Sequence, residues 1–335
     1  MEKGSVVPVE VRTITAGKFR RYSHLSLARH LTTPSIALAN IRDVFKVAVG
    51  FFQSLAIIMR FKPDVLFAKG GFVCLPLGIA ARVLGVPIVV HDSDTRPGLT
   101  NSILGRWAAA IATGSPLENY RYPAAISRYV GVPISAEFSP YSDAAQQKAK
   151  RELGFDAKRP LVVVTGGGLG AVTINDAMIL AAKKLLADKV QVYHVTGRQH
   201  YDEIAVLAPK SDNYKVVPFV YQGMADVLGG ADIVISRASA TFIQELAGLK
   251  KVAILVPSRA LGDQRKNAVV YKEAGAAVVL TDDEIAEPEA LPRKIQQLLA
   301  DPVHREKLAE RLHSYARPNA ARDVADIVID TARKR

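Results

Sequence analysis

The sequence predicts an α/β protein with two similar halves, each a parallel sheet covered by helices. Short β-branched runs alternate with helical stretches along most of the 335 residues, which is the pattern of parallel strands joined by helical crossovers. Residues 63–91 and 231–257 echo each other, because both run from a strand through a small-residue loop and a helix to a second strand. Apolar residues make up 49% of the chain and charged residues 23%, which excludes a disordered or fibrous protein.

Each expected element has a local signal. Apolar runs that start or end at Gly, Pro or Asp predict strands, and the helices between them carry apolar stripes such as the one through Ile174, Met178 and Leu185. The expected strands are residues 65–68 and 88–90 in the first half, and 161–164, 190–195, 215–219, 232–236, 252–256 and 277–280 in the second. The boundary between the halves is expected near residue 134, before a polar stretch that ends at residue 150.

Charge and cysteine usage restrict the partners and the compartment. Lys and Arg exceed Asp and Glu by 12, and so basic a balance favours an anionic partner such as a phosphorylated ligand, an anionic lipid surface or nucleic acid. The basic residues are scattered without a nucleic-acid motif, so nucleic acid is not expected. A single cysteine, Cys74, makes no internal disulfide and no zinc cage, and fits a reducing compartment. The most apolar stretch, residues 47–59, is too short for a membrane span.

A glycine-rich turn gives the strongest chemical signal. The strand at 161–164 ends in four glycines, Gly166, Gly167, Gly168 and Gly170, and a helix begins near Ala171. Glycines let backbone N–H groups approach a phosphate, and the helix N-terminus favours negative charge. A plain tight turn would look the same. The turn is not a P-loop, since no Gly-Lys-Ser/Thr follows, and no acidic residue completes a dinucleotide fingerprint.

Two further loops leave strands at the same edge of the second sheet. Residues 236–246 pass from a strand through small residues into a helix that carries Glu245 one turn in. A carboxylate there can accept hydrogen bonds from both hydroxyls of a ribose, although a solvated helix glutamate is the commoner case. Residues 262–268 follow the next strand and include Gln264 and Asn267. Open α/β sheets bind ligands at the carboxyl ends of their strands, so the three loops predict one shared crevice.

These loops resemble the MurG-type N-acetylglucosaminyltransferases of glycosyltransferase family 28. The resemblance continues in the first half, in the Lys-Gly-Gly-Phe-Val of residues 69–73, the His-Asp-Ser-Asp of residues 91–94 and the Pro-Gly-Leu-Thr-Asn of residues 97–101. It implies a GT-B fold, with two Rossmann-like domains facing a cleft. It also implies an acceptor domain at residues 1–134, a donor domain at 135–318 and a last helix, 319–335, that returns to the first domain.

The resemblance implies an inverting, metal-independent transfer that needs no cofactor. N-acetylglucosamine would pass from UDP-N-acetylglucosamine to an undecaprenyl-pyrophosphoryl-muramoyl-peptide, in peptidoglycan synthesis. Glu245 would hold the ribose, Val220 the uracil, and Gln264 the sugar hydroxyls. The diphosphate would lie among Gly166, Gly167, Gly168, Gly170, Ala240 and Thr241, with Asn267 also on the donor side, while Gly70, Gly71, Asp94 and Asn101 would face the acceptor.

The sequence departs from the family pattern at several positions. Gly168 and Leu169 replace a Ser-Gln pair, Ser135 replaces a donor-site arginine, and Asp94 replaces an asparagine. The family's opening strand and its Gly-Gly-Thr-Gly-Gly-His loop have no counterpart, so the first domain is expected to be truncated at its N-terminus. That loop carries the histidine usually proposed as general base. We therefore consider His91 and Asp92, at the end of a strand, as candidate catalytic residues.

Other interpretations of these residues remain open. Asp-Ser-Asp at 92–94 also matches a metal motif of another glycosyltransferase fold, and His91 is equally well a strand-end histidine bonded to backbone. The chain would alternatively be an inactive or partner-dependent fragment that binds UDP-sugar and membrane. A sugar-nucleotide epimerase of the same fold is a weaker possibility.

A lipid-linked acceptor predicts a peripheral position on the cytoplasmic face of the membrane. Residues 47–60 are apolar on nearly all sides and are flanked by Lys46, Arg60 and Lys62, with Lys18, Arg20 and Arg21 upstream. Apolar insertion combined with basic residues near anionic lipid describes an interfacial helix. A core helix under the first sheet would have a similar sequence.

Overall fold

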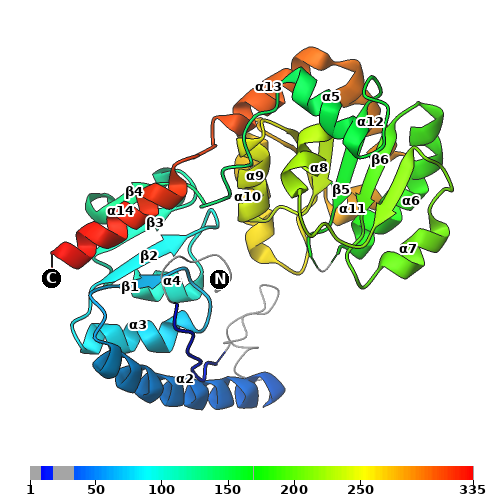
Figure 1. The fold of residues 1–335 in the computed structure, drawn as a ribbon. Helices are drawn as coiled ribbons and strands as arrows, with labels where there is room; N and C mark the ends of the chain where they lie inside the picture. Colours follow the sequence, from blue (N-terminus) through cyan, green and yellow to red (C-terminus); the bar gives the residue numbers. More distant parts are fainter. Residues whose placement is uncertain (1–8, 18–33, 169, 335) are drawn as a thin grey trace.

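The structure, a computed structural model, describes residues 9–17, 34–168 and 170–334. Two parallel sheets form the framework (Figure 1), a four-stranded sheet in the order β1-β2-β3-β4 and a six-stranded sheet in the order β10-β9-β8-β5-β6-β7. All neighbouring strands in both sheets are parallel. The predicted α/β class with two parallel-sheet halves is confirmed.

The first sheet and its helices come from the N-terminal third of the chain. In order they are α2 (Pro34–Phe61), β1 (Leu66–Ala68), α3 (Cys74–Val83), β2 (Ile88–Asp92), α4 (Leu99–Leu104), β3 (Ala110–Thr113), the 3-10 helices η2 (Leu117–Asn119) and η3 (Ala124–Ile126), and β4 (Ser127–Tyr129). The sequence analysis missed β3 and β4. Their strands are short, and the alanines of β3 have low β-propensity, so neither gives a strong strand signal.

The second sheet accounts for most of the rest. Its elements are α5 (Asp143–Glu152), β5 (Leu161–Thr165), α6 (Val172–Ala187), β6 (Gln191–Val195), α7 (Tyr201–Leu207), β7 (Tyr214–Val217), α8 (Met224–Gly230), β8 (Ile233–Ser236), α9 (Ala240–Gly248), β9 (Val252–Leu255), α10 (Gly262–Glu273), β10 (Val278–Val279), α11 (Asp282–Ala286), α12 (Ala290–Ala300) and α13 (Pro302–His313). The topology reverses between β5 and β8, since β6 and β7 extend the sheet one way and β8 to β10 the other. Ligands of open α/β sheets bind at such a reversal.

The last helix, α14 (Ala320–Arg333), returns to the first sheet (Figure 1). Val324 and Ile327 lie in one buried cluster with Val89 of β2 and Ala112 of β3. Burying this stripe fixes the C-terminal helix on the first sheet, so the chain crosses between the two sheets twice. The domain boundary after residue 134 stays a prediction.

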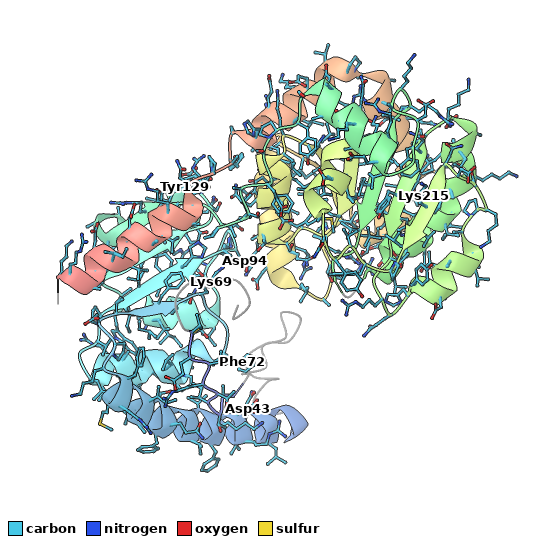
Figure 2. The ribbon with its side chains drawn as sticks, viewed as in Figure 1. Asp43, Lys69, Phe72, Asp94, Tyr129 and Lys215 are labelled. Atoms are coloured by element: carbon cyan, nitrogen blue, oxygen red, sulfur yellow. The ribbon has the colours of Figure 1, made fainter. Side chains whose placement is uncertain are left out.

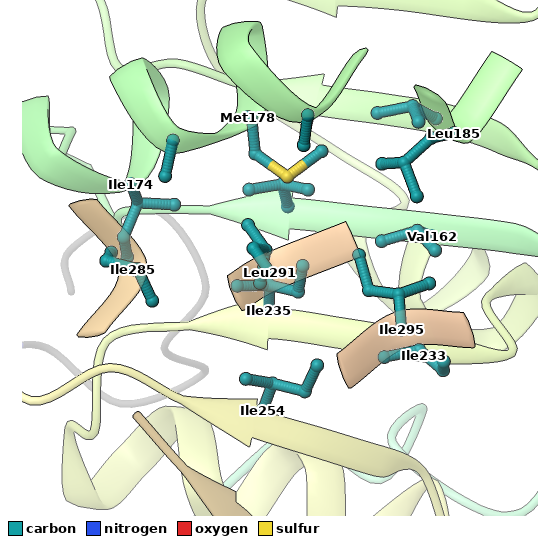
Figure 3. Close-up of a cluster of buried hydrophobic side chains, with 14 of the residues drawn as sticks. Val162, Ile174, Met178, Leu185, Ile233, Ile235, Ile254, Ile285, Leu291 and Ile295 are labelled. Atoms are coloured by element: carbon teal, nitrogen blue, oxygen red, sulfur yellow. The ribbon is translucent and has the colours of Figure 1, made fainter. Parts of the chain in front are cut away.

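The second domain has the larger core. Figure 3 shows α6 covering one face of the sheet, with its stripe of Ile174, Met178 and Leu185 over Val162 of β5 and Ile235 of β8. Each of these five side chains is fully buried. A continuous apolar strand surface needs cover on both faces, and this packing holds the carboxyl end of β5 rigid beneath the loop that follows it.

The helix α2 is longer than the apolar run that predicted it and lies along the outside of the first domain (Figure 1). Ser54 and Ile58 are buried on its inner side. Part of the segment 9–17 crosses it, because Thr15 donates its backbone N–H to Gln53 at 2.7 Å. The upstream basic residues Lys18, Arg20 and Arg21 lie outside the described residues.

Candidate functional site

A pocket of about 320 Å³ opens at the carboxyl ends of β5, β8 and β9, where the sequence predicted a shared crevice. It lies beside the topological reversal of the six-stranded sheet. Its lining consists of Thr165, Gly166, Gly167, Gly168, Gly170, Ser236, Arg237, Ser239, Phe242, Ser258, Leu261 and Gln264. All four glycines of the predicted loop, together with Gln264, are therefore brought to one cavity.

The glycine loop has a shape that only glycine fits. A Cβ on Gly166 would lie 2.3 Å from the backbone nitrogen of Ala171, and one on Gly170 would lie 2.3 Å from the carbonyl oxygen of Thr196. Gly167 and Gly170 also have left-handed φ angles of +83° and +80°. The loop therefore brings bare backbone to the pocket wall, which is the condition for close approach to a phosphate. Leu169, where the sequence departs from the family pattern, lies outside the described residues.

Three helices begin at this pocket with uncapped N-termini. The N-cap residues Ala171 of α6, Ser239 of α9 and Leu261 of α10 make no side-chain capping hydrogen bond. No side chain therefore occupies the first backbone N–H groups of these helices, although in α10 the N–H of Gln264 donates to the carbonyl of Leu261 at 3.1 Å. The helix dipoles favour an anion there. Ala240 and Thr241 form the first turn of α9, and Thr241 is exposed.

Glu245 lies one turn after Thr241 on α9 and is half-buried. Burial, helped by the nearby charge of Glu137, raises the pKa of the Glu245 carboxyl to about 7. Among the described residues no side chain or backbone group donates a hydrogen bond to this carboxylate. A partly buried carboxylate without a donor is ready to accept hydrogen bonds from a ligand's hydroxyl groups.

Two pocket residues lie within the predicted motif, but the sequence analysis assigned them no role. The Oγ of Ser236 is buried and has no hydrogen-bond partner among the described residues. Arg237 pairs with Asp282 at 2.7 Å and donates to the hydroxyl of Thr173 at 3.3 Å. The Ser-Arg-Ala-Ser sequence was the available signal, but the partners of Arg237 come from distant helices that spacing does not reveal.

Gln264 lines the pocket, whereas Val220 is not among its lining residues. Val220 is half-buried and packs against the core of the second domain. Its neighbour Phe219 approaches the position of a Cβ on Gly168 at 3.7 Å. Arg198 stacks over the ring of Phe219 at 4.7 Å. Gln264 accepts a hydrogen bond from the backbone of Ser258 at 3.0 Å, which fixes its side chain at the pocket wall.

Asn267 bridges the two domains instead of facing the donor pocket. Its Oδ1 accepts from the backbone N–H of Thr95 at 2.9 Å, and its Nδ2 donates to Asp94 at 2.9 Å and to the carbonyl of Ala238 at 3.2 Å. The side chain is 1% exposed. The donor-binding role predicted for Asn267 is not supported by this geometry, because its amide is already used in holding the domains together.

The structure also argues against His91 and Asp92 as groups that reach a substrate. His91 is fully buried, its Nε2 lies 2.9 Å from the carbonyl oxygen of Gly131, and burial lowers its pKa. Asp92 is 4% exposed, and its two oxygens accept from Asn101 and from the hydroxyl of Tyr122. Both side chains are enclosed by partners at the end of β2, where they hold the loop that follows. For His91 this geometry matches the alternative of a strand-end histidine bonded to backbone, and the catalytic role of either residue stays a prediction.

That loop carries Asp94 to the space between the domains. Figure 2 shows Asp94 and Lys69 on the side of the first domain that faces the second. The Oδ1 of Asp94 accepts from Asn267, while its Oδ2 has no hydrogen-bond donor among the described residues. Burial, reinforced by the charge of Asp263, raises the pKa of the Asp94 carboxyl. Asp94 is therefore a carboxylate with one free oxygen at the boundary between the predicted acceptor and donor sides.

Gly70 and Gly71 follow β1 in left-handed conformations, with φ of +91° and +82°. A Cβ on Gly70 would lie 3.1 Å from the amide of Asn101. Asn101 is buried, donates to the backbone of His91, and has an Oδ1 without a partner among the described residues. The loops after β1 and β2 are thus packed together.

The described residues contain no group of three His, Cys, Asp or Glu side chains that could hold a metal ion.

One helix in the described part of the chain, within α2 at Asn40–Phe61, is long and apolar enough to cross a membrane by length and composition. The outward side of α2 exposes several large apolar side chains. These are Leu38, Ile41, Val44, Phe45, Val49, Phe52, Met59 and Phe61.

Comparison with known proteins identifies the family. The N-terminal domain of glycosyltransferase family 28 matches residues 7–113, and its C-terminal domain matches residues 161–326. A protein of Geobacillus thermodenitrificans is 32% identical over 298 residues, which cover 88% of this chain and 78% of the relative. One of Lachnospira eligens is 35% identical over 292 residues, covering 86% and 76%. Both are named UDP-N-acetylglucosamine–N-acetylmuramyl-(pentapeptide) pyrophosphoryl-undecaprenol N-acetylglucosamine transferase.

The chain belongs to glycosyltransferase family 28. The recognition of this family from the sequence is confirmed. Among solved structures, MurG of Acinetobacter baumannii superposes with a TM-score of 0.70 at 25% identity, over 86% of this chain and 79% of that one. The MnaA–UDP structure of S. aureus has a TM-score of 0.62 at 14% identity, over 90% and 85%, and is similar in fold alone. The expected GT-B fold of two Rossmann-like domains is confirmed.

Proposed function

We propose that this family 28 chain transfers N-acetylglucosamine from UDP-N-acetylglucosamine to an N-acetylmuramyl-pentapeptide on pyrophosphoryl-undecaprenol. The observation that carries the proposal is the donor pocket, where a glycine loop and three uncapped helix N-termini converge. The relatives that share most of the chain carry the name of this activity. No observation favours the alternative of an inactive fragment.

The donor side supports UDP binding through backbone groups. The diphosphate would lie among Gly166–Gly170 and the first turn of α9 at Ala240 and Thr241, where free N–H groups and helix dipoles replace a metal ion. Glu245 would accept hydrogen bonds from the ribose hydroxyls, and the backbone at Val220 would contact uracil. The partnerless hydroxyl of Ser236 supports an additional contact to the ligand. Stabilising the departing diphosphate in this way is the main electrostatic contribution.

The acceptor side supports an approach from the first domain. The exposed backbone of Gly70 and Gly71 would face the pyrophosphate of the acceptor, and Asn101 would hold this loop against the next. Inverting transfer requires a base that removes the proton from the attacking hydroxyl. We assign this role to Asp94, because it has a free carboxylate oxygen between the two sides, a raised pKa and partial exposure. A base within reach contributes about 10²–10⁴-fold to the rate.

The lipid-linked acceptor requires contact with a membrane, and α2 supplies a surface for it. Its exposed apolar side chains follow helical spacing, and the basic residues Arg42, Lys46, Arg60 and Lys62 lie on or beside the helix. One apolar face beside basic residues is the composition of an interfacial helix on anionic lipid. The buried side of α2 at Ser54 and Ile58 supports a helix that lies on the membrane. We propose peripheral attachment to the cytoplasmic face.

The proposed donor site can be tested by calorimetric titration with UDP-N-acetylglucosamine in the presence of a metal chelator. We expect the wild-type chain to bind and the Glu245→Ala variant to lose most of its affinity. The transfer itself is tested with radiolabelled donor and a lipid-linked muramyl-pentapeptide in vesicles, where a β-linked disaccharide product is expected. Binding by neither protein would contradict the donor assignment, and binding without transfer would contradict the acceptor assignment.

A further inference from the structure

A second and larger cavity, of about 1230 Å³, lies on the other side of α10 from the donor pocket. Its lining comes from both domains. Arg96, Arg106 and Arg121 come from the loops and helix that follow β2 and β3, while Arg265 and Lys266 come from α10. Because Gln264 lines the donor pocket, the two cavities are separated by adjacent residues of one helix.

The charges around this cavity are unbalanced. Five cationic side chains line it, against the two carboxylates of Glu118 and Glu273. Lys266 pairs with Asp263 at 3.3 Å. The guanidinium groups of the four arginines form no ion pair or hydrogen bond with any described residue, and each arginine is exposed. Unpaired guanidinium groups that converge on a cavity are suited to bidentate recognition of carboxylate or phosphate.

One wall of the cavity is aromatic. Tyr120 and Tyr122 stack with ring centroids 5.9 Å apart, and both line the cavity. The hydroxyl of Tyr120 donates to the backbone of Asp94 at 2.6 Å, and that of Tyr122 donates to Asp92. The wall is therefore rigid, and it is tied directly to the loop that carries Asp94.

The strand order of the first sheet determines the order of the loops at its carboxyl edge, and the cavity lies beside the loop that follows β3. The strands run β1-β2-β3-β4. Their carboxyl ends present in turn the Gly70–Gly71 loop, the loop of Asp94, and the loop of Arg121. Helix α2 packs on α3, beside β1, at the start of this line (Figure 1). An extended ligand that begins near α2 and crosses Asp94 therefore reaches the cavity next.

We propose that this cavity binds the peptide of the acceptor through its terminal carboxylate. This inference rests on the proposed function. Muramic acid bears a carboxyl group, so a peptide joined to it is attached by its amino end and leaves a free carboxylate at the other end. With the lipid at α2, the pyrophosphate at Gly70–Gly71 and the sugar at Asp94, the anionic peptide falls among the arginines. Because these come from both domains, the bound peptide contacts the two halves at once.

The test removes three of the charges without changing the pairing of any described residue. In the triple variant Arg106→Gln/Arg121→Gln/Arg265→Gln, we expect the KM for the lipid-linked muramyl-pentapeptide to rise roughly tenfold, because each exposed charge contact contributes about two- to threefold. The kcat and the KM for UDP-N-acetylglucosamine should stay within twofold. With an acceptor that lacks the peptide, the variant and the wild type should have the same KM.

A matched control loses the same charge elsewhere. Arg128, Arg151 and Arg293 are exposed and lie outside the cavity, so Arg128→Gln/Arg151→Gln/Arg293→Gln should leave both KM values unchanged. The KM could rise equally for the acceptors with and without the peptide, or the control variant could raise the KM as much as the cavity variant does. The cavity arginines would then act only through the net charge of the protein or through contacts with lipid headgroups. Either result would overturn the proposal.

A direct binding measurement separates this proposal from the proposed function. The probe is a fluorescently labelled muramyl-pentapeptide without lipid, followed by anisotropy. The wild type and the control should bind it, and the cavity variant should bind roughly tenfold more weakly. Failure of the wild type to bind overturns the peptide site even if transfer occurs. Transfer that is equally efficient with and without the peptide on the acceptor also overturns the peptide site. If the protein binds both UDP-N-acetylglucosamine and this probe but performs no transfer, only the proposed function is overturned.

Discussion

The two halves of this molecule share a fold, but they offer different surfaces to their substrates. The donor pocket is built largely of backbone, with a glycine loop and three helix N-termini at the end of a well-packed six-stranded sheet. The proposed acceptor side adds side chains to the backbone of Gly70 and Gly71. Asp92 and Asn101 hold a loop that presents Asp94, and arginines line the next cavity. The difference suggests that donor binding depends on conformational freedom at glycines, whereas the acceptor side depends on charge.

The largest effect is expected at Asp94, the carboxylate that we propose as the general base. Asp94→Asn should lower kcat by about 10²–10⁴-fold, as loss of a general base does, while UDP-N-acetylglucosamine affinity changes little. The folded protein raises the pKa of Asp94. The proposed base is therefore protonated, and inactive, at a higher pH than an ordinary aspartate would be. The acidic limb of the wild-type kcat profile should therefore lie above the usual range of an aspartate, and the variant should lack it.

Asp92→Asn is the comparison for this variant. Asp92 accepts two side-chain hydrogen bonds and is nearly fully buried, so its variant should lower thermal stability more than Asp94→Asn does. A loss of less than tenfold in the activity of Asp92→Asn would exclude it as the base. If instead Asp92→Asn abolished kcat at full stability and Asp94→Asn remained active, the assignment to Asp94 would be wrong.

The next effect tests whether the donor half depends on its backbone. Gly170→Ala should weaken UDP-N-acetylglucosamine binding by about a hundredfold, because the new Cβ meets the carbonyl oxygen of Thr196 at 2.3 Å and the φ angle is left-handed. Gly167→Ala is the matched variant, since it has the same strain of φ but open space around the Cβ. It should lose less affinity. If calorimetry shows the same loss of affinity in both variants, the strain of the left-handed φ angle alone accounts for the loss, without the clash of the Cβ.

A smaller effect is expected at Glu245, where the donor half uses a side chain. The folded-state pKa of about 7 lies above that of an ordinary glutamate, so the carboxyl contributes stability below its unfolded pKa and loses it as the pH rises through 7. Accepting hydrogen bonds from ribose requires the ionised form. UDP-N-acetylglucosamine affinity should therefore rise roughly tenfold between pH 6 and pH 8, with proton release that appears as a buffer-dependent binding enthalpy.

Glu245→Gln tests whether ionisation of Glu245 causes the expected change of affinity with pH. The variant keeps the size of the side chain but cannot ionise, so both its affinity and its stability should be flat over the same pH range. If the wild-type affinity does not vary with pH, or if the variant retains the same variation, Glu245 is not the group that titrates on binding.

The sequence was sufficient to locate the glycine-rich pocket because the determinants of its loop are local. The strand, the glycine loop and the helix are consecutive in the chain, so the loop could be placed before the structure was known. Gln264 could be placed at the same pocket because it also follows the carboxyl end of a strand. Asn267, His91 and Asp92 were placed at the right strand ends, but their hydrogen-bond partners were not predicted. Their surroundings come from distant segments, such as Gly131 for His91 and Thr95 for Asn267, and no spacing rule reveals such contacts.

The smallest expected effect concerns the outer face of the acceptor half. Phe45→Gln/Phe52→Gln removes two rings that are 69% and 67% exposed on α2. We expect roughly fivefold weaker binding to vesicles containing anionic lipid, since interfacial binding scales with the apolar area inserted. In sedimentation with vesicles, the matched control Val206→Gln/Leu207→Gln, on exposed residues of α7 in the donor half, should bind as the wild type does. Equal weakening by both variants would mean that the membrane does not distinguish the two halves, and that α2 is not the attachment surface.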